Sequence, residues 1–599
     1  MTDVIVAGGG PVGMMAAALL DAAGVRVAVY ERNPGPVRQS RGSTMHPRTL
    51  EVLSLLDTGT GERISDVLLA QGRRVPDSHF ATLPDRLDYR DLDTPFPFVL
   101  QISQWRTEAA LAELLRTKGV PVRYGAEIVE VAQSPDEVRV RVGQDWHCAR
   151  FLIGADGAHS PVRKAAGIGF PGTTPDQVGF VADLELAEPV ERPLHFWDAG
   201  TGHASVVPLT DRLVRVFGVR ASDVGLSSSE VRRRQARPLT LAEVAEALTA
   251  ISGRDFGVHN ASWLSRGSTN ASRHASAFRV GRVLLAGDAA HVHLPAGGQG
   301  LNVGLQDATN LAWKLAAEVH GWAPSRLVTG ESGYDAERRP VAEALCVNTQ
   351  AQDALMHTFT PSGAALRQMF SGFIAQGGEL HHELAGTMSG LSLAYPPPDG
   401  THPLTGTRAP DLPLGRRPAG PIPADRGPAD RDSVIRALRP DRFLLLDFTP
   451  GHSLADLGSA RVEVRSAPVP ERAGWRGVQA ALIRPDGYVA HAATSPAGLA
   501  EAVAAWTEPD RHPGASPESE QGPGASAGSE QGPGVSAESD QRPGVSAGPD
   551  RRPGVSAESN QRPRVLAGSE QGSVGSAGPD QRAVGSAGPG GRSVVARGC

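Results

Sequence analysis

Cysteine is scarce in this 599-residue sequence, and long apolar runs are missing. The three cysteines, Cys148, Cys346 and Cys599, lie far apart and form no CxxC pair. Because a dithiol redox centre and a thiolate zinc site both need closely spaced thiols, the sequence excludes these two kinds of site. So few thiols also fit a reducing compartment, and we expect a cytoplasmic protein. No apolar stretch of about 18 residues runs free of glycine and proline, so no membrane-spanning helix is expected.

An excess of positive charge is absent as well. Lysine and arginine number 59 against 65 aspartate and glutamate residues, which gives a net charge of −6, and no long basic block occurs. Nucleic acid is therefore not an expected partner. The N-terminus lacks the positive segment of a secretory signal, since Asp3 is the only early charge and Pro11 interrupts the apolar run. A chain of this length is expected to form two or three domains.

A glycine-rich segment near the N-terminus follows a short apolar strand. The strand covers residues 4–7, the segment reads Gly-Gly-Gly-Pro-Val-Gly over residues 8–13, and a helix is predicted from residue 11 to about 23. In a dinucleotide fold the first glycine permits the tight turn, the second lets the backbone approach a pyrophosphate, and the third allows close helix packing. The next strand, 25–30, ends at Glu31, whose carboxylate can bond both ribose hydroxyls. The alternative is a glycine loop that binds no nucleotide.

Two later strands each end beside an aspartate. This feature favours a flavin dinucleotide as the cofactor. One strand leads to Asp156-Gly157 and another to Gly287-Asp288, where a carboxylate can bind the hydroxyls of a ribityl chain. Residues 295–302, Pro-Ala-Gly-Gly-Gln-Gly-Leu-Asn, then open a helix with apolar residues three and four apart. Free N–H groups at a helix start stabilise the negative charge of reduced flavin. The alternative for Gly297–Gly300 is an ordinary loop before a helix.

On these motifs the chain resembles the single-component, FAD-dependent aromatic hydroxylases of the para-hydroxybenzoate hydroxylase type, and most of all the bacterial aromatic-polyketide hydroxylases. The resemblance covers about residues 1–505 and includes the segments 41–51 and 104–108. It implies an α/β fold. A Rossmann-type FAD-binding domain would carry an inserted, mostly antiparallel substrate sheet, and a thioredoxin-like C-terminal domain and a disordered repeat tail would follow.

The implied domain limits follow changes in composition along the chain. FAD-binding parts are expected at 1–171 and 279–395 (the latter with a helical region from 331), the substrate sheet at 172–278, and the thioredoxin-like domain at 400–508. Because no CxxC is present, that last domain is assigned a structural or oligomer-contact role. Residues 513–599 repeat every ten residues without aromatic side chains, so they cannot bury enough apolar area to offset backbone ordering. Disorder is therefore favoured over a β-solenoid.

The resemblance also assigns individual residues. Glu31 would touch the ribose, Ile128 would lie by the adenine, and Asp288 would bind the ribityl–pyrophosphate region. The predicted cofactor-binding residues are Gly8, Gly10, Val12, Gly13, Glu31, Arg32, Arg41, Gln104, Ile128, Asp156, Asp288, Gly300, Leu301 and Asn302. The candidates for the flavin edge are Arg41, Pro295, Gly297 and Gly298. Arg41 has the alternative of a solvated loop charge, and Gln104 that of a cap for a helix starting at Thr107.

Substrate contacts are predicted from aromatic residues of the inserted sheet. Its strands are expected at 178–186, 195–197, 204–208 and 213–219. The pocket candidates are Phe196, Trp197, Phe217 and Trp263, each with the alternative of an ordinary core residue. His291 and His293 have no third ligand nearby, so no metal site is predicted. No side chain stands out from the sequence as a general base.

The predicted activity is that of a flavin-dependent monooxygenase with FAD as cofactor. NADPH or NADH would reduce the flavin, O2 would add at C4a, and the resulting C4a-hydroperoxide would hydroxylate an aromatic polyketide or another phenolic substrate. No second glycine fingerprint exists, so the reductant is expected to bind only transiently. The other expected partners are the small aromatic substrate and O2, and the protein is expected to be a monomer or a homodimer.

Three other functions stay open at the level of the sequence. A Baeyer–Villiger oxygenation of a polyketide and an antibiotic-inactivating oxygenation would use the same flavin motifs. A flavoprotein that only sequesters an antibiotic would show no substrate-dependent NADPH consumption. A flavin halogenase is disfavoured, because none of the eight tryptophans forms the Gly-Trp-x-Trp-x-Ile-Pro signature.

Overall fold

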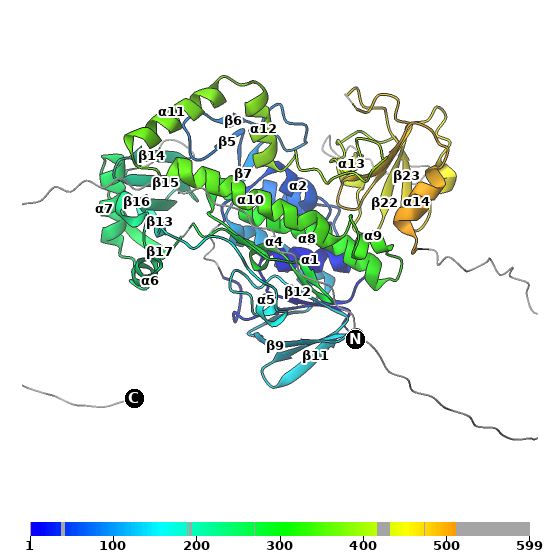
Figure 1. The fold of residues 1–599 in the computed structure, drawn as a ribbon, viewed down its shortest axis with the longest axis horizontal. Coiled ribbons are helices and arrows are strands. Elements are labelled where there is room, and N and C mark those ends of the chain that lie inside the picture. The colour runs from blue at the N-terminus through cyan, green and yellow to red at the C-terminus, as the bar shows by residue number, and fades with distance from the viewer. Residues whose placement is uncertain are drawn as a thin grey trace, which may run out of the picture. The chain divides into compact units, whose positions relative to one another are not determined.

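The computed structural model describes residues 2–37, 42–188, 190, 194–268, 270–415, 432–472 and 474–510 (Figure 1). Arg41 and the repeat tail, 513–599, lie outside the described residues. The described part is a mixed α/β fold with a helical layer on a buried sheet. None of its helices is long and apolar enough to cross a bilayer.

The central sheet has six strands in the order β19-β20-β12-β1-β2-β8. Five are parallel and β19 pairs antiparallel at the edge, with bounds β1 Val4–Ala7, β2 Val27–Glu31, β8 Val122–Tyr124, β12 Phe151–Gly154, β19 Arg279–Val280 and β20 Val283–Leu285. Strands β1, β2, β12 and β20 are buried along their whole length. Uninterrupted apolar strands are typical of a parallel sheet covered on both faces, because neither face can be left to water.

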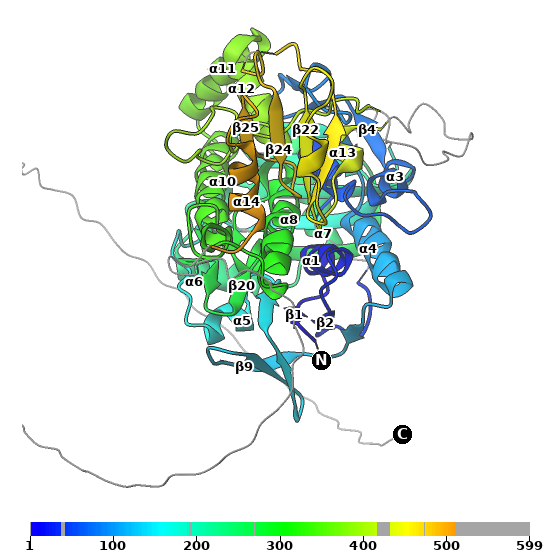
Figure 2. The ribbon, with the colours of Figure 1, turned by 90° about the vertical axis from the view of Figure 1, so that its right-hand side faces the viewer.

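Helices cover this sheet and carry the glycine-rich segments. Helix α1 (Pro11–Ala22) connects β1 to β2 and packs between α8 (Gln299–Val319) and α4 (Gln104–Lys118), as Figure 2 shows. The prediction of one buried face on the long helix α8 is too narrow, because residues 304–317 are buried on every side, including the polar Asp307, Asn310 and Lys314. A meander of β9 Ile128–Gln133, β10 Val138–Val142 and β11 Asp145–Ala149 lies between β8 and β12 in the chain.

Short elements complete the region between β2 and α4. They are β3 Thr44–Met45, α2 Pro47–Leu53, α3 Ile64–Leu69, β4 Arg73–Val75, β5 Asp77–Ser78, β6 Leu87–Asp88 and β7 Val99–Gln101. Strands β3, β7 and β4 form one small sheet, and β5 pairs with β6. Helix α5 (Pro161–Ala165) follows β12, and the two-stranded pair of β18 (Arg273–His274) and β21 (His291–Val292) leads into α8.

The inserted region forms an antiparallel sheet in the order β14-β15-β16-β13-β17, here called the substrate sheet. Its strands are β13 Gly179–Leu186, β14 His195–Ala199, β15 Gly202–Pro208, β16 Leu213–Arg220 and β17 Val258–Ser268, within two residues of the limits predicted for the first four. Helix α7 (Leu241–Ser252) covers one face and buries Val244 and Leu248 against it, while α6 (Ser228–Gln235) lies near β17.

A helical region and a second, smaller sheet complete the chain. The helices are α9 Ser325–Val328, α10 Tyr334–Met356, α11 Pro361–Ala375 and α12 Gly378–Ser389. The C-terminal sheet has the order β23-β22-β24-β25, with bounds β22 Phe443–Asp447, β23 Val462–Ser466, β24 Ala480–Ile483 and β25 Val489–Ala493, and α13 Val434–Ala437 and α14 Leu499–Thr507 accompany it. Phe443 of this sheet packs against Trp313 and Trp322, so the unit docks on the end of α8.

Candidate active site

The first glycine loop lies where the carboxyl end of β1 meets the start of α1. Gly8 has φ +105°, and a Cβ there would lie 2.3 Å from the carbonyl oxygen of Ala155. A Cβ at Gly13 would lie 2.1 Å from the carbonyl oxygen of Gly8. In contrast, a Cβ at Gly10 would meet no protein atom within 4 Å. The fold itself thus requires Gly8 and Gly13, whereas the described residues around Gly10 leave room for a side chain or for a ligand.

Glu31, predicted to bind the ribose, is held rigidly at the end of β2. Its carboxylate accepts hydrogen bonds from the backbone N–H groups of Gly9 (2.7 Å) and Asn33 (2.8 Å). An ionised carboxylate has about four acceptor positions, so two remain for ribose hydroxyls. The N–H of Ala126 donates to the carbonyl of Glu31, which brings the buried Ile128 close to this corner. The neighbouring Arg32 is exposed.

The two aspartate loops lie side by side at the same edge of the sheet. Asp156 accepts the backbone N–H of Val162 (3.0 Å) at the start of α5, and burial raises the pKa of its carboxyl. Arg163 of α5 donates to the carbonyl of Ala289 (2.9 Å), next to Asp288. The side chain of Asp288 is exposed in this loop. Asp156 and Asp288, both predicted to bind the cofactor, therefore lie in two loops that Arg163 joins.

A buried network of charged side chains centred on α8 holds the Gly287-Asp288 loop in place. Asp307 of α8 accepts from the N–H of Gly287 (3.2 Å), from Nε2 of His291 (2.7 Å) and from Nε of Arg338 (2.8 Å). Burial opposes ionisation of Asp307, but Arg338 and His291 outweigh it and lower its pKa. His291 is thus engaged by Asp307. Among the described residues, no group of three or more His, Cys, Asp or Glu side chains is arranged to hold a metal ion.

The start of α8 is held by Asn302 and His46. Asn302 accepts the N–H of His46 (2.8 Å) and donates to the carbonyls of Thr44 (3.0 Å) and Gly298 (2.7 Å). Nε2 of His46 donates to the carbonyl of Gly297 (2.8 Å), and burial lowers the pKa of His46 to about 4. Gly297 and Gly298 have φ +64° and +67°, so this turn needs glycine at both positions. We call residues 295–302 the flavin loop.

Gln104 and Leu301 meet next to the flavin loop. Oε1 of Gln104 accepts the N–H of Gly42 (3.1 Å), and its Nε2 donates to Glu108 (2.8 Å). A Cβ at Gly42 would lie 2.7 Å from Gln104 Oε1 and 3.2 Å from Leu301 Cδ2, so three segments converge here. The alternative prediction of a helix that starts at Thr107 and is capped by Gln104 is wrong, because α4 begins at Gln104 itself.

The other predicted cofactor residues occupy the rim of the same region. The side chain of Val12 lies 3.0 Å from a Cβ placed on Gly287, so it packs against the second aspartate loop. A Cβ at Gly300 would lie 3.1 Å from Nε2 of His293, so the absence of a side chain at Gly300 leaves room for this imidazole ring. Burial and the neighbouring His291 lower the pKa of His293 to about 4. Pro295 is exposed at the edge of the flavin loop.

Three of the four predicted pocket aromatics share one face of the substrate sheet. Strand register aligns Phe196 with Ser205 and Phe217, and places Trp263 two residues along on the same side through its pairing with Asp183. This face, here called the site face, is only partly covered, and the three rings are half-buried. Arg215 bridges it by pairing with Asp183 (2.7 Å) and lying over the Trp263 ring.

The prediction for Trp197 is wrong. It lies on the opposite face, where its ring is 5.4 Å from that of Phe256 in the core under α7. Successive residues of a strand point to opposite faces, so Phe196 and Trp197 cannot both line one pocket. Trp197 is therefore a core residue of the substrate sheet.

The structure adds polar residues on the site face that sequence reasoning missed. The rings of His79 and Phe196 are 4.8 Å apart, and those of His203 and Phe196 are 6.3 Å apart. Nδ1 of His203 lies 2.8 Å from Oδ1 of Asp198, whose carboxylate also pairs with Arg367 of α11. A signal was present in the sequence, because Asp198 and His203 stand symmetrically about the glycine-containing turn between two predicted strands.

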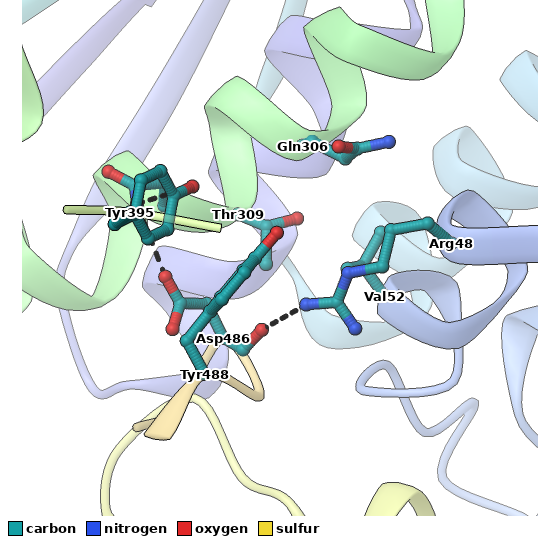
Figure 3. A pocket seen from close by; sticks show the side chains of 8 residues that line it. Arg48, Val52, Gln306, Thr309, Tyr395, Asp486 and Tyr488 are labelled. Atoms are coloured by element: carbon teal, nitrogen blue, oxygen red, sulfur yellow. Dashed lines mark hydrogen bonds between the residues drawn. The ribbon is translucent and has the colours of Figure 1, made fainter. Parts of the chain in front are cut away.

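A second polar cluster joins the C-terminal sheet to the helices beneath it. Arg484 pairs with Glu337 (2.6 Å) and Asp486 (2.6 Å), and Lys314 of α8 pairs with Glu337 (2.6 Å). Burial lowers the pKa of Lys314 to about 8, and although burial opposes it, Arg484 and Lys314 lower the pKa of Glu337 to about 2. Figure 3 shows the cavity at this junction, which has room for about one water molecule and is lined by Arg48, Val52, Gln306, Thr309, Asn310, Tyr395, Asp486 and Tyr488. We call this contact between the C-terminal sheet and the helices the ionic seam, and its cavity is too small for an aromatic substrate.

Together these features define a class of protein. Glycine loops and aspartates gather at the carboxyl ends of parallel strands, and helix N-termini face the same place, which is the geometry of a dinucleotide-binding flavoprotein. The residues present fit a flavin. The space beside Gly10 can admit an additional group, and the buried Nδ1 of His46 near the flavin loop has no partner among the described residues.

Comparisons with known proteins make the class specific. Residues 1–349 match the family described as FAD binding domain, and residues 402–509 match the one described as aromatic-ring hydroxylase, C-terminal. An uncharacterized aromatic compound monooxygenase of Bacillus subtilis is 38% identical over 499 residues, 82% of this chain and 94% of that protein. A rifampicin monooxygenase of Streptomyces venezuelae is 37% identical over 511 residues, 84% of this chain and 98% of that protein.

A solved structure agrees over the same range. The anhydrotetracycline hydroxylase of Streptomyces rimosus is 35% identical, covers 84% of this chain and 99% of its own, and superposes with a TM-score of 0.72. The chain therefore belongs to the FAD-dependent aromatic hydroxylase family, whose members include an anhydrotetracycline monooxygenase of Streptomyces rimosus. It is a flavin-dependent monooxygenase by family, with FAD as cofactor and NAD(P)H as the family's reductant.

Proposed function

We propose that this protein uses FAD, O2 and NADPH or NADH to hydroxylate an aromatic polyketide or another phenolic compound. The observation that carries the proposal is the juxtaposition of the flavin loop with the site face. Gln352 links them, because its Oε1 accepts the N–H of Ala81 (3.0 Å) and lies 3.7 Å from a Cβ placed on Gly297. Ala81 follows His79, which contacts Phe196 on the site face.

The cofactor would be held by the residues that the fold gathers at the strand ends. We propose Gly8, Gly10, Gly13 and Glu31 for the adenosine and pyrophosphate, with Val12, Arg32 and Ile128 around them. Asp156 and Asp288 would serve the ribityl and phosphate region, and Gln104, Pro295, Gly297, Gly298, Gly300, Leu301 and Asn302 would border the ring. When bound, FAD supplies electron transfer from the nicotinamide and converts O2 into the oxygen donor.

The chain's own residues then have three tasks. The N–H groups at the start of α8, which lack a side-chain cap, stabilise negative charge near the flavin loop. Asn302 and His46 keep those groups in place through main-chain bonds. Phe196, Phe217 and Trp263 offer flat apolar surfaces on which a polycyclic substrate can pack, and the buried Asp183–Arg215 pair adds polar contacts.

The finer architecture belongs to the same proposal. We assign residues 1–171 and 279–395 to FAD binding, 172–278 to substrate binding and 400–508 to a thioredoxin-like domain. The last assignment is supported by the four-stranded order, in which β22 and β23 are parallel and β24 is antiparallel to both of its neighbours. Its ionic seam with α8 and α10 supports a structural role.

The test is NADPH and NADH oxidation by the purified protein against anthraquinones, angucyclines and simple phenols, with product mass determined for each. Hydroxylation adds one oxygen and keeps every ring, whereas a Baeyer–Villiger reaction inserts the oxygen into a ring or chain. Phe217→Ala on the site face should raise KM, while Trp197→Phe on the opposite face serves as the matched control. A protein that binds the compounds without substrate-dependent NAD(P)H consumption would be a sequestering flavoprotein, and the proposal would be wrong.

A further inference from the structure

The hairpin of β14 and β15 builds a carboxylate–imidazole pair on the site face. Asp198 and His203 are register partners, and their Oδ1 and Nδ1 atoms are 2.8 Å apart. His203 is only 3% exposed, and Arg367 holds the second carboxylate oxygen of Asp198 from α11. We call Asp198 and His203 the dyad.

The hydrogen bonds of the dyad fix where the imidazole proton resides. A carboxylate can only accept, so Nδ1 of His203 carries the hydrogen and Nε2 presents a lone pair. None of the described residues bonds to this Nε2 atom. Burial lowers the pKa of His203 although Asp198 opposes it, and His357 and Arg367 lower it further. Nε2 is therefore the acceptor atom of this ring, and Asp198 is the group that favours the protonated form against burial.

A complementary donor, His79, contacts the same Phe196 ring as the dyad. The N–H of Thr82 donates to Nδ1 of His79 (3.2 Å), so the neutral ring of His79 carries its hydrogen on Nε2. Burial, with Arg86 and neighbouring histidines, keeps the pKa of His79 well below its usual value. The site face thus presents a proton acceptor and a neutral N–H donor next to one aromatic ring, and the two together can hold a hydroxyl group and its ionised form.

We propose that His203 is the base that removes the proton of a phenolic hydroxyl from the substrate, and that Asp198 is its positioning residue. This proposal rests on the proposed function and narrows its substrate class to aromatics with an ionisable hydroxyl directed to β15. The O–H bond breaks, its proton forms a bond to Nε2, and the electron pair stays on the oxygen. Asp198 balances the imidazolium, which returns the proton when the product leaves. The ring of the resulting phenolate is richer in electrons and therefore reacts more readily with an electrophilic oxygen atom.

The first test needs neither turnover nor a known substrate. Alizarin, a dihydroxyanthraquinone, changes from yellow to red when a hydroxyl ionises, so its visible spectrum reports its protonation state. We expect the FAD-bound wild type to bind alizarin or a related hydroxyanthraquinone in the ionised form at a pH where the free dye is neutral. His203→Gln should bind the neutral form. Absence of the ionised band with wild type across the dyes, or an unchanged band in His203→Gln, would overturn the proposal.

The second test is the pH profile of product formation. Loss of a general base lowers the rate about 10²- to 10⁴-fold, and we expect this loss in His203→Gln at neutral pH. The deficit should shrink as the pH passes the pKa of the substrate's own hydroxyl, which a merely structural defect would not do. His259→Gln is the matched control, because His259 of β17 also lies near a carboxylate, Glu185 (3.5 Å), but its side chain is 44% exposed.

The two proposals can fail separately. If His203→Gln does not retain FAD, Asp198→Asn replaces it, since the amide keeps the shape and removes the charge that supports the imidazolium. A wild type that ionises the dye but never oxygenates any substrate would refute the proposed function and leave the dyad supported. A wild type that oxygenates phenols with a pH profile identical to those of both variants would refute the dyad alone.

Discussion

In the first glycine loop, a glycine-to-alanine substitution adds one methyl group. Depending on the position, that group should affect either folding or cofactor binding, so the two effects can be measured apart. Gly10 has φ −75° and ψ 177°, which any residue adopts, and a Cβ there meets no protein atom within 4 Å. Gly10→Ala should therefore change the free energy of unfolding of the FAD-free protein by no more than about 1 kcal/mol. If the pyrophosphate lies against this backbone, the methyl group overpacks the site at about 1–3 kcal/mol, a loss of roughly 5- to 150-fold in FAD affinity.

Gly8→Ala is the contrasting control for that measurement. Its φ of +105° costs an L residue about 1–2 kcal/mol, and the collision with Ala155 at 2.3 Å adds about 1–3 kcal/mol, so folding itself should weaken by about 2–5 kcal/mol. Urea unfolding of the FAD-free proteins followed by circular dichroism gives the stabilities, and quenching of flavin fluorescence gives the FAD dissociation constants. A Gly10→Ala protein that folds normally and binds FAD as tightly as wild type would refute the placement of the pyrophosphate.

Three further predictions concern stability and its dependence on pH. Trp197→Ala removes a ring packed against Phe256 and the core under α7 and should lower the free energy of unfolding by about 3–5 kcal/mol. Phe217→Ala, half-buried like Trp197 but on the other face, should cost less, and equal losses in urea unfolding would contradict the assignment of faces. Asp307→Asn leaves the buried Arg338 without its charge partner and should lower the free energy of unfolding by about 3–5 kcal/mol. It should also weaken FAD binding in a fluorescence titration, and an unchanged FAD affinity would show that the ionic network does not position the Gly287-Asp288 loop for the cofactor. The pKa of Glu337 is about 2 in the fold against 4.5 in the unfolded chain, so its stabilisation is complete above pH 4.5 and is lost as the pH falls toward 2. Unfolding midpoints measured across this range should fall less in Glu337→Gln than in wild type, and parallel curves would contradict the pairing.

The motifs that could be predicted from the sequence are those determined by the local backbone conformation and by nearby residues. Gly8 and Gly297 have a positive φ that their own turns require, and Gly13 contacts Gly8 five residues before it, although Gly8 also approaches the distant Ala155. The strand before Gly8 carries uninterrupted apolar residues. The predicted strands of the substrate sheet follow from alternation in the same way. The start of α4 was missed by three residues, because Ser103 supplies an extended N-cap backbone without a side-chain cap and so leaves no strong boundary signal.

Features decided by distant segments were beyond such reasoning. Alternation predicts that Phe196 and Trp197 point to opposite faces, but which face becomes core depends on α7, more than forty residues further along the chain. The dyad lacked a visible role for the same reason, since Arg367 and His79 reach it from segments on either side in sequence. The ionic seam joins residue 337 to residue 484, and charged residues in a sequence usually indicate a solvated surface rather than a buried pair.

The anchoring of the flavin loop has a consequence for how such proteins diversify. The four hydrogen bonds through which His46 and Asn302 hold this loop involve only residues 44–46 and 297–302. These four bonds do not involve the substrate sheet, so substitutions on the site face leave them in place, and Gln352 is the side chain that links the two regions. Evolution, or a protein engineer, can retune which molecule is accepted while inheriting the oxidative chemistry intact.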